Sequence, residues 1–177
     1  MIDPVAAERF LSAHWLAEVD RQTKQAILNA LLETKATEGT LLLAQGQPND
    51  HLTFLIEGSV ALERAFSNGR KESITTLQAP AVFGTTSFFQ PRPPTVNVIA
   101  SEDVWMLSLY HPQHEALRLS NPKAAEALAL AMVRTLSERF DLLDALFTEF
   151  ITKNRDEPPR LSEWADFRSK LFEEQTP

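Results

Sequence analysis

Residues 83–96 read Phe-Gly-Thr-Thr-Ser-Phe-Phe-Gln-Pro-Arg-Pro-Pro-Thr-Val, and this segment carries the most information about the fold. Gly84 permits a tight turn, and Arg92 follows it eight residues later. Three hydroxyl side chains come directly after the glycine: Thr85, Thr86 and Ser87. Successive backbone N–H groups in such a turn form a concavity of partial positive charge, which a guanidinium can close around an anion. The segment therefore predicts a site for one small anion.

Short strands joined by tight turns are predicted on both sides of this segment, from residue 39 to residue 109. Three apolar residues in one of these strands alternate with their neighbours: Leu52, Phe54 and Ile56. Asn68-Gly69, between two further strands, is typical of a two-residue hairpin turn. Several short strands at this spacing favour an antiparallel sandwich or jelly roll.

Helical patterns flank the strand region. From Val5 to Leu32 apolar residues recur at helical spacing, with Asp20 as the N-cap of a second helix. Asn121-Pro122 opens another helix, and no breaker follows before Pro158. A helix of about 30 residues would be roughly 45 Å long. The sequence therefore predicts an α+β fold, in which an antiparallel, jelly-roll-like β-roll has N-terminal helices and a long C-terminal dimerisation helix.

The dimerisation role comes from an apolar stripe on the long helix, with spacings of 3, 4, 3, 4 and 3 residues. The stripe consists of Val133, Leu136, Phe140, Leu143, Phe147 and Phe150. A heptad stripe requires a facing helix, which favours a homodimer; cover by the chain's own C-terminal tail is the alternative.

Three parts of the chain are expected. Residues 1–120 form the β-roll with its N-terminal helices, and residues 121–154 form the dimerisation helix. Residues 155–177 form a proline-broken connector and a short amphipathic helix at 161–172. We expect this last helix to dock on its own protein or across the dimer; the alternative is a surface for another partner.

Composition excludes several function classes. The chain has 177 residues and no cysteine, which excludes disulfides, thiolate catalysis and iron–sulfur clusters. A net charge of −7 offers no general attraction to nucleic acid or anionic membranes. Three basic residues near the predicted hairpin are interpreted as solvated loop residues: Arg64, Arg70 and Lys71. No apolar run approaches the roughly 20 residues that span a bilayer, and no leader pattern opens the chain, so we expect a cytoplasmic protein without membrane contact.

From about Phe10 to Phe150 the chain resembles the cyclic-nucleotide-binding domain family. That family's phosphate-binding cassette reads roughly Phe-Gly-Glu, a short apolar run, then Pro-Arg-x-Ala-Thr, which Phe83-Gly84 and Pro91-Arg92 match. The segments 39–46 and 54–60 resemble the family's opening strands. Within the family the chain looks most like the catabolite-activator (Crp/Fnr)-like bacterial regulators, which dimerise through this C-helix and carry a winged helix-turn-helix.

The resemblance implies a sensor without enzymatic activity, metal or cofactor, whose effector contains a phosphate and could be cyclic AMP or cyclic GMP. Arg92 would meet the cyclic phosphate with help from Thr95. Alignment of the C-helix on Met132 and Leu136 places Arg139 and Phe140 where family members contact the base. The implied ligand-binding residues are Gly84, Thr85, Thr86, Ser87, Arg92, Thr95, Arg139 and Phe140.

Three features depart from the family pattern. Thr85 stands where the family has a ribose-binding glutamate, and the loop before Pro91 is about two residues shorter. Pro93 and Pro94 have no N–H to offer a phosphate. Three outcomes stay open: a cyclic mononucleotide site, a site for a different small anion, or a degenerate pocket in a ligand-free dimeric interaction module. The alternative for Arg92 itself is a surface arginine that pairs with Glu102 or a nearby acid.

Other function classes fit the sequence less well. Only 26 residues follow Ile151, too few for a helix-turn-helix, so we expect no direct DNA binding and a signal that passes through the C-helix to a protein partner. A metal-binding cupin needs two or three converging histidines, and haem sensing needs one that stands out. Neither requirement is met by the spacing of His14, His51, His111 and His114.

Overall fold

A computed structural model describes residues 2–153 of the chain, except for the side chains of residues 146, 147 and 149–153. The predicted connector and the helix at 161–172 lie outside the described residues. The chain divides into two units after Met132. The first unit contains both sheets, and the described part of the second is the C-terminal portion of one long helix.

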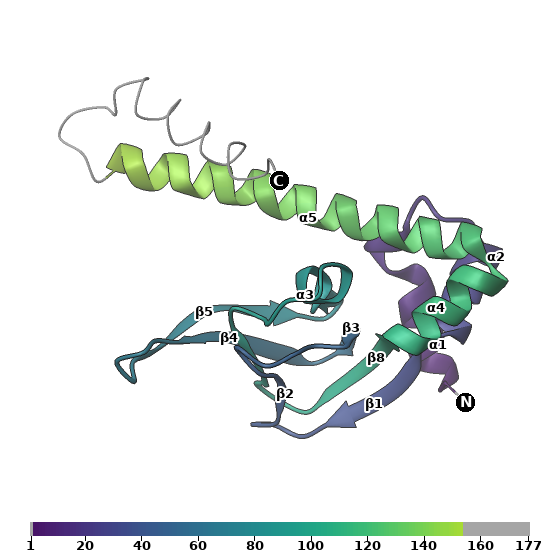
Figure 1. Cartoon of the computed structure of the whole chain (residues 1–177), viewed down its shortest axis with the longest axis horizontal. Coiled ribbons are helices and arrows are strands. Elements are labelled where there is room, and N and C mark those ends of the chain that lie inside the picture. The colour runs from purple at the N-terminus through teal and green to yellow at the C-terminus, as the bar shows by residue number, and fades with distance from the viewer. Residues whose placement is uncertain (1, 154–177) are drawn as a thin grey trace. The chain divides into compact units, whose positions relative to one another are not determined.

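The order of elements confirms the α+β class and the jelly-roll-like fold (Figure 1). The N-terminal helical elements are α1 (Pro4–Ser12), the short 3-10 helix η1 (His14–Leu16) and α2 (Arg21–Asn29). The strands are β1 (Leu32–Ala36), β2 (Leu41–Leu43), β3 (His51–Glu57), β4 (Ser59–Ala65), β5 (Lys71–Gln78), β6 (Ala81–Phe83), β7 (Asn97–Ala100) and β8 (Val104–Tyr110). The remaining helices are α3 (Thr85–Phe89), α4 (His111–Ser120) and α5 (Pro122–Lys153).

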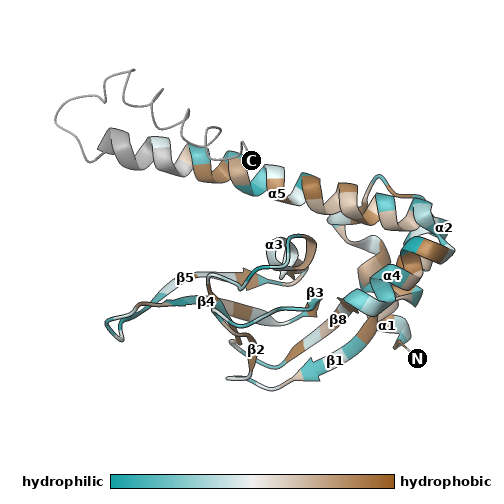
Figure 2. Ribbon diagram, viewed as in Figure 1, coloured by the Kyte–Doolittle hydropathy of each residue, from teal (hydrophilic) through white to brown (hydrophobic). Residues whose placement is uncertain are grey.

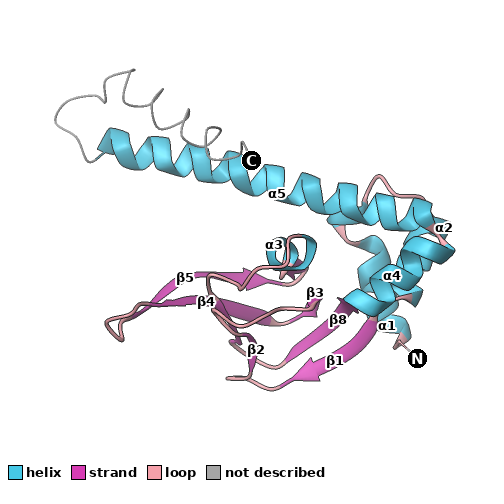
Figure 3. Ribbon diagram, in the orientation of Figure 1, coloured by secondary structure: helices cyan, strands magenta, loops and turns pink. Residues whose placement is uncertain are grey.

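Two four-stranded antiparallel sheets form the β-roll, in the orders β1-β8-β3-β6 and β2-β7-β4-β5. Strand β3 is buried on both faces because it lies in the middle layer. Its residues Leu52, Phe54 and Ile56 join the core beneath the helices, whereas Leu55 joins the core between the sheets. Figure 3 shows α1, α2 and α4 gathered at one end of the strands. The residues that alternate along this strand therefore pack on opposite sides of it, one set toward the helices and the other toward the second sheet.

Local signals in the sequence are confirmed at three places. The Asp20 carboxylate caps α2 by accepting the N–H of Thr23 at 2.9 Å, and the Asn121 side chain caps α5 by accepting the N–H of Ala124 at 3.1 Å. The N–H and hydroxyl of Thr23, together with Lys123, hold the pKa of Asp20 below its usual range. Asn68-Gly69 lies in the turn that joins β4 to β5, where Gly69 has a φ of 82°.

Two elements differ from the sequence prediction. The helical pattern was expected to continue to Leu32, but β1 begins there and pairs with β8 at the edge of its sheet. This strand buries none of its side chains completely, so it has no apolar alternation to reveal it. Helix α4 was also not predicted, because Leu117 is its one fully buried residue and no apolar stripe marks it.

The long helix α5 confirms the predicted C-terminal helix, with 32 residues from Pro122 to Lys153. Figure 2 shows apolar residues interspersed with hydrophilic ones along it. Three members of the heptad stripe are largely exposed: Val133 at 57%, Phe140 at 54% and Leu143 at 62%. Leu136 is half-buried, and the side chains of Phe147 and Phe150 are outside the described set. None of the helices within residues 2–153 has the length and apolar character of a bilayer-spanning segment.

Candidate functional site

Gly84 is the N-cap of the short helix α3 and adopts a left-handed conformation with φ 80°. A Cβ atom at this position would lie 2.8 Å from the carbonyl oxygen of His51 and 3.3 Å from Nδ2 of Asn49. Both the backbone conformation and the close approach of β3 therefore require glycine. The turn predicted from the sequence is present, and it is tightly constrained.

Helix α3 places the predicted hydroxyl residues in one helical turn. The N–H of Phe88 donates to the carbonyl of Gly84 at 2.9 Å, which closes that turn. The first residues of a helix have N–H groups without intrahelical acceptors, so the start of α3 supplies backbone donors. Thr85 and Ser87 are buried, whereas Thr86 is exposed.

The Thr85 hydroxyl is the most unusual polar group of this turn. Thr85 is only 2% exposed, and within residues 2–153 its Oγ1 has no hydrogen-bond partner. A buried polar group without a partner costs about 1–3 kcal/mol, and native proteins contain few of them. Because Oγ1 itself is buried, a group from outside the chain could satisfy this hydroxyl only after a shift of α3 exposed it.

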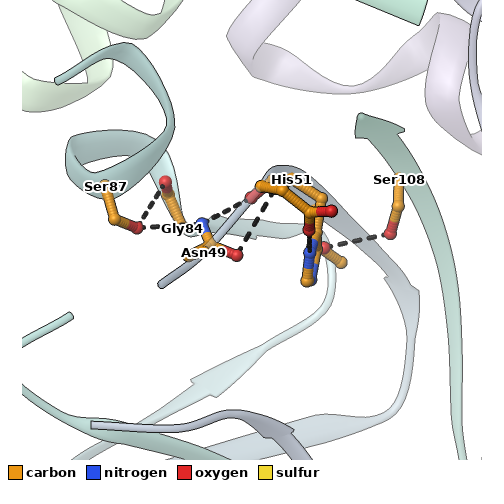
Figure 4. A network of polar contacts seen from close by, with 7 residues as sticks. Asn49, His51, Gly84, Ser87 and Ser108 are labelled. Carbon is orange, nitrogen blue, oxygen red and sulfur yellow. Dashed lines mark hydrogen bonds and ion pairs between the residues drawn. The ribbon is translucent and has the colours of Figure 1, made fainter. Parts of the chain in front are cut away.

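A polar network fixes the position of α3 relative to β3 (Figure 4). Nδ2 of the buried Asn49 donates to the carbonyl of His51 at 2.7 Å and to Oγ of Ser87 at 2.9 Å. The Ser87 hydroxyl donates in turn to the carbonyl of Gly84 at 3.2 Å. The sequence did not indicate Asn49, which is 38 positions from Ser87 and belongs to a turn-rich loop.

Arg92 and Thr95 lie in the loop that follows α3, and both are exposed. The N–H of Gly46 donates to the carbonyl of Pro94 at 2.9 Å, so this loop is anchored to the turn before β3. In the part of the chain that the structure describes, Arg92 forms no ion pair with Glu102 or with any other acid. The guanidinium is therefore available to an anion from solution.

Arg64 is a further cation beside this loop. Its Nε donates to the carbonyl of Thr95 at 3.4 Å, a long hydrogen bond. The sequence predicts a solvated loop residue at Arg64, but the residue lies in β4, next to β7. The pairing of β4 with β7 brings it near the cassette, and no local pattern reveals that pairing.

Aromatic rings attach α3 to α4. Phe88 stacks on His111 with ring centroids 4.5 Å apart and an interplanar angle of 5°, and it meets His114 edge-on at 5.3 Å. Burial, with Arg118 and His111 nearby, holds the pKa of His114 below its usual value. These two histidines therefore contribute to packing.

Arg139 and Phe140 belong to the unit beyond Met132, where both side chains are exposed on α5. Their contact with a ligand bound at the cassette remains a prediction. Gly84 to Ser87 lie in α3 and its N-cap, and Arg92 and Thr95 lie in the loop after it, all within the first unit. That these residues converge on one anion also remains a prediction.

A large surface hollow lies away from the cassette. It measures about 1010 Å³ and is lined by the N-terminal segment, α2 and β1. An anion is bound by convergent hydrogen-bond donors, which the volume of a hollow does not by itself provide. The cassette therefore remains the candidate site. Among residues 2–153 no group of three or more histidine or acidic side chains could hold a metal ion.

Comparison with known proteins places residues 33–121 in the family described as "Cyclic nucleotide-binding domain". The chain is 26% identical over 125 residues to the CRP-like cAMP-activated global transcriptional regulator of Mycobacterium tuberculosis, an alignment that covers 70% of this chain and 56% of the relative. The chain spans about half the length of the curated relatives it matches.

Solved structures show the same fold. The N-terminal domain of a transcriptional regulator from Streptomyces coelicolor is 26% identical, with a TM-score of 0.64, and the match covers 76% of this chain and 94% of that one. A cyclic nucleotide-binding domain from Methylobacillus flagellatus superposes with a TM-score of 0.73 at 18% identity, over 85% of both chains.

Proposed function

Because this chain belongs to the cyclic nucleotide-binding domain family, we propose that it is a regulatory sensor whose cassette binds a small phosphate-containing effector. Cyclic AMP is the first candidate and cyclic GMP the second, since the relative from M. tuberculosis is named as activated by cAMP. The proposal contains no catalytic step, in line with relatives that are named as regulators.

The observation that carries this proposal is the buried Thr85 hydroxyl without a partner, at the start of a turn that only glycine can form. An effector that places a polar group against Oγ1 would remove the cost of the unpaired hydroxyl. The N-terminal amides of α3 and the exposed guanidinium of Arg92 would supply the positive charge for its phosphate.

The output of the sensor is a further part of the proposal. We expect two chains to pair along the exposed stripe of α5, because large apolar side chains such as Phe140 and Leu143 are costly to leave in water. Arg139 and Phe140 would contact the effector's base, so that binding would favour one arrangement of α5. The signal would then pass to a protein partner.

A second candidate function is a ligand-free dimeric interaction module with a degenerate pocket. Pro93 and Pro94 favour it, because neither has an N–H to donate to a phosphate beside Arg92. Thr85 also offers only a neutral hydrogen bond where a charged one would be stronger.

A thermal-shift screen of nucleotides against wild type and Arg92→Ala tests the proposal. A ligand that binds only the folded state must raise the melting temperature, so cyclic AMP or cyclic GMP should do so for wild type. Loss of a hydrogen bond to a charged group should weaken binding roughly 10- to 100-fold in Arg92→Ala. The melting temperature of this variant without ligand should be unchanged, because Arg92 is exposed.

Arg21→Ala is the matched control, since Arg21 is also an exposed arginine and lies at the start of α2. This control should bind like wild type. If wild type shows no shift at millimolar nucleotide and Arg92→Ala behaves like wild type in every assay, the interaction module becomes the better account.

A further inference from the structure

We infer that Asn49 is a positioning residue of the effector site: acting through Ser87, it holds α3 where the cassette turn can receive an anion. Its effect on binding rests on the proposed function, whereas its effect on α3 can be measured without a ligand.

The orientation of the Asn49 side chain is determined by its partners. Asn49 is 9% exposed, and the carbonyl oxygen of His51 lies 2.7 Å from one end of its carboxamide. A carbonyl only accepts hydrogen bonds, so the NH₂ group of Asn49 must face it. The Oδ1 atom then points to the N–H of His51, which donates to it at 3.4 Å. The second N–H of the carboxamide remains for Ser87.

Ser87 completes a chain of hydrogen bonds with one direction. Its single hydroxyl proton goes to the carbonyl of Gly84 at 3.2 Å, which leaves its oxygen lone pairs for the Asn49 N–H at 2.9 Å. Ser87 is 2% exposed, so no water replaces these contacts easily. Every proton of the network has an acceptor, and the network connects the start of β3 to the first turn of α3 (Figure 4).

This network matters because α3 has only five residues and cannot be stable by itself. Its position depends on tertiary contacts: the Asn49–Ser87 bond on the β3 side and the Phe88–His111 stack on the α4 side. Thr85 lies at the start of the same turn. If the Asn49–Ser87 bond is lost, α3 should leave its place more often, and the apparent affinity falls in proportion to the population that can bind.

A second buried hydrogen bond of β3 provides a matched control. Thr53 of β3 and Ser108 of β8 form a buried hydroxyl pair with 3.0 Å between their oxygens, and Ser108 is 4% exposed. Ser108→Ala therefore removes a hydrogen bond of similar length and burial that does not involve α3. If Ser87 only stabilised the fold as a whole, Ser87→Ala and Ser108→Ala would change amide exchange in α3 and the affinity for cyclic AMP equally.

The test uses the full chain as wild type, Ser87→Ala, Ser108→Ala, Asn49→Ala and the Asn49→Ala/Ser87→Ala double variant. Alanine is the best helix former, so a loosened α3 in Ser87→Ala cannot be attributed to helix propensity. Hydrogen exchange is measured at the amides of Phe88 and Gln90, which donate to the carbonyls of Gly84 and Thr86 within α3. Calorimetry with cyclic AMP gives the dissociation constant of each variant.

Ser87→Ala and Asn49→Ala should each exchange these amides faster than wild type and Ser108→Ala. Both should also bind cyclic AMP about three- to tenfold more weakly. The double variant should be no worse than the more affected single variant, because both substitutions remove the same bond between β3 and α3. Equal exchange at Phe88 and Gln90 in Ser87→Ala and Ser108→Ala would overturn the inference, as would unchanged cyclic AMP affinity in variants of a wild type that binds. Absence of cyclic AMP binding by wild type would count against the proposed function instead, and the exchange rates would still decide the role of Asn49.

Discussion

The middle strand β3 and the cassette segment that follows β6 belong to the same domain but differ in how their polar groups are satisfied. Residues 52–56 of β3 are buried on both faces, and the hydroxyl of Thr53 is paired with that of Ser108. In the cassette, Thr85 is just as buried but its hydroxyl has no partner in the described chain, and Arg92 is exposed without an ion pair. The first region has the features of a stable core, and the second has the features of a site that is completed from outside.

The largest effect should come from breaking the core side of this comparison. Phe54 is completely buried, and its ring meets Phe10 at 5.1 Å and Trp15 at 5.6 Å. Phe54→Ala should lower the free energy of unfolding by about 3–5 kcal/mol, because it removes apolar contacts and leaves a cavity. Urea denaturation followed by circular dichroism measures this loss. A loss below about 1 kcal/mol would show that β3 does not form the layer between the two cores.

A smaller effect of opposite sign is expected at the cassette. Thr85→Val removes a buried hydroxyl without a partner and keeps the branched shape, so the ligand-free protein should gain about 1 kcal/mol of stability, or a few degrees in melting temperature. The same substitution should weaken cyclic AMP binding, because the group that the effector would satisfy is gone. Thr53→Val is the matched control, since its hydroxyl is paired with Ser108, and it should destabilise the protein. A loss of stability in Thr85→Val equal to that in Thr53→Val would contradict this account of the cassette.

The smallest expected effect is a pH dependence where the cassette meets α4. Burial holds the pKa of His114 below its usual value of about 6.5, with Arg118 and His111 adding to the shift and Glu115 opposing it. Below pH 6.5 His114 therefore binds more protons in the unfolded chain than in the folded one. The contribution of His114 to stability is complete above pH 6.5 and declines as the pH falls through it.

Urea midpoints at pH 7.5 and pH 5.5 measure this dependence. The midpoint of wild type should fall at the lower pH, and it should fall less in His114→Gln. The same fall in both proteins would show that other groups cause it. Asp20 does not interfere in this window, because its pKa is lowered and its contribution is lost only below the usual aspartate range.

Local signals explain how much of the fold could be predicted from the sequence. The alternation in β3, the caps Asp20 and Asn121, and the Asn68-Gly69 turn are each written within a few residues. The edge strand β1 and the helix α4 were missed because they bury few side chains and thus carry no periodic signal. A helix or strand could be predicted from the sequence where it buries enough side chains to produce a periodic apolar pattern.

The candidate site was predictable only in its local part. Gly84 and the hydroxyls after it form one continuous segment, so their turn could be recognised. The Asn49–Ser87 bond joins residues 38 positions apart, and Arg64 meets the carbonyl of Thr95 across 31 positions. Such contacts arise from the packing of strands into sheets, which local sequence does not specify. The state of the Thr85 hydroxyl likewise depends on what surrounds it in three dimensions.

Calorimetric titration of the full-chain protein with cyclic AMP, carried out in parallel on wild type and Arg92→Ala, is the most direct test of the cassette as an anion-binding site. We expect saturable binding by wild type and an affinity roughly 10- to 100-fold lower for Arg92→Ala, with the two proteins equally stable when free of ligand. Equal affinity of the two proteins, or no binding heat from wild type at millimolar cyclic AMP, would contradict the account.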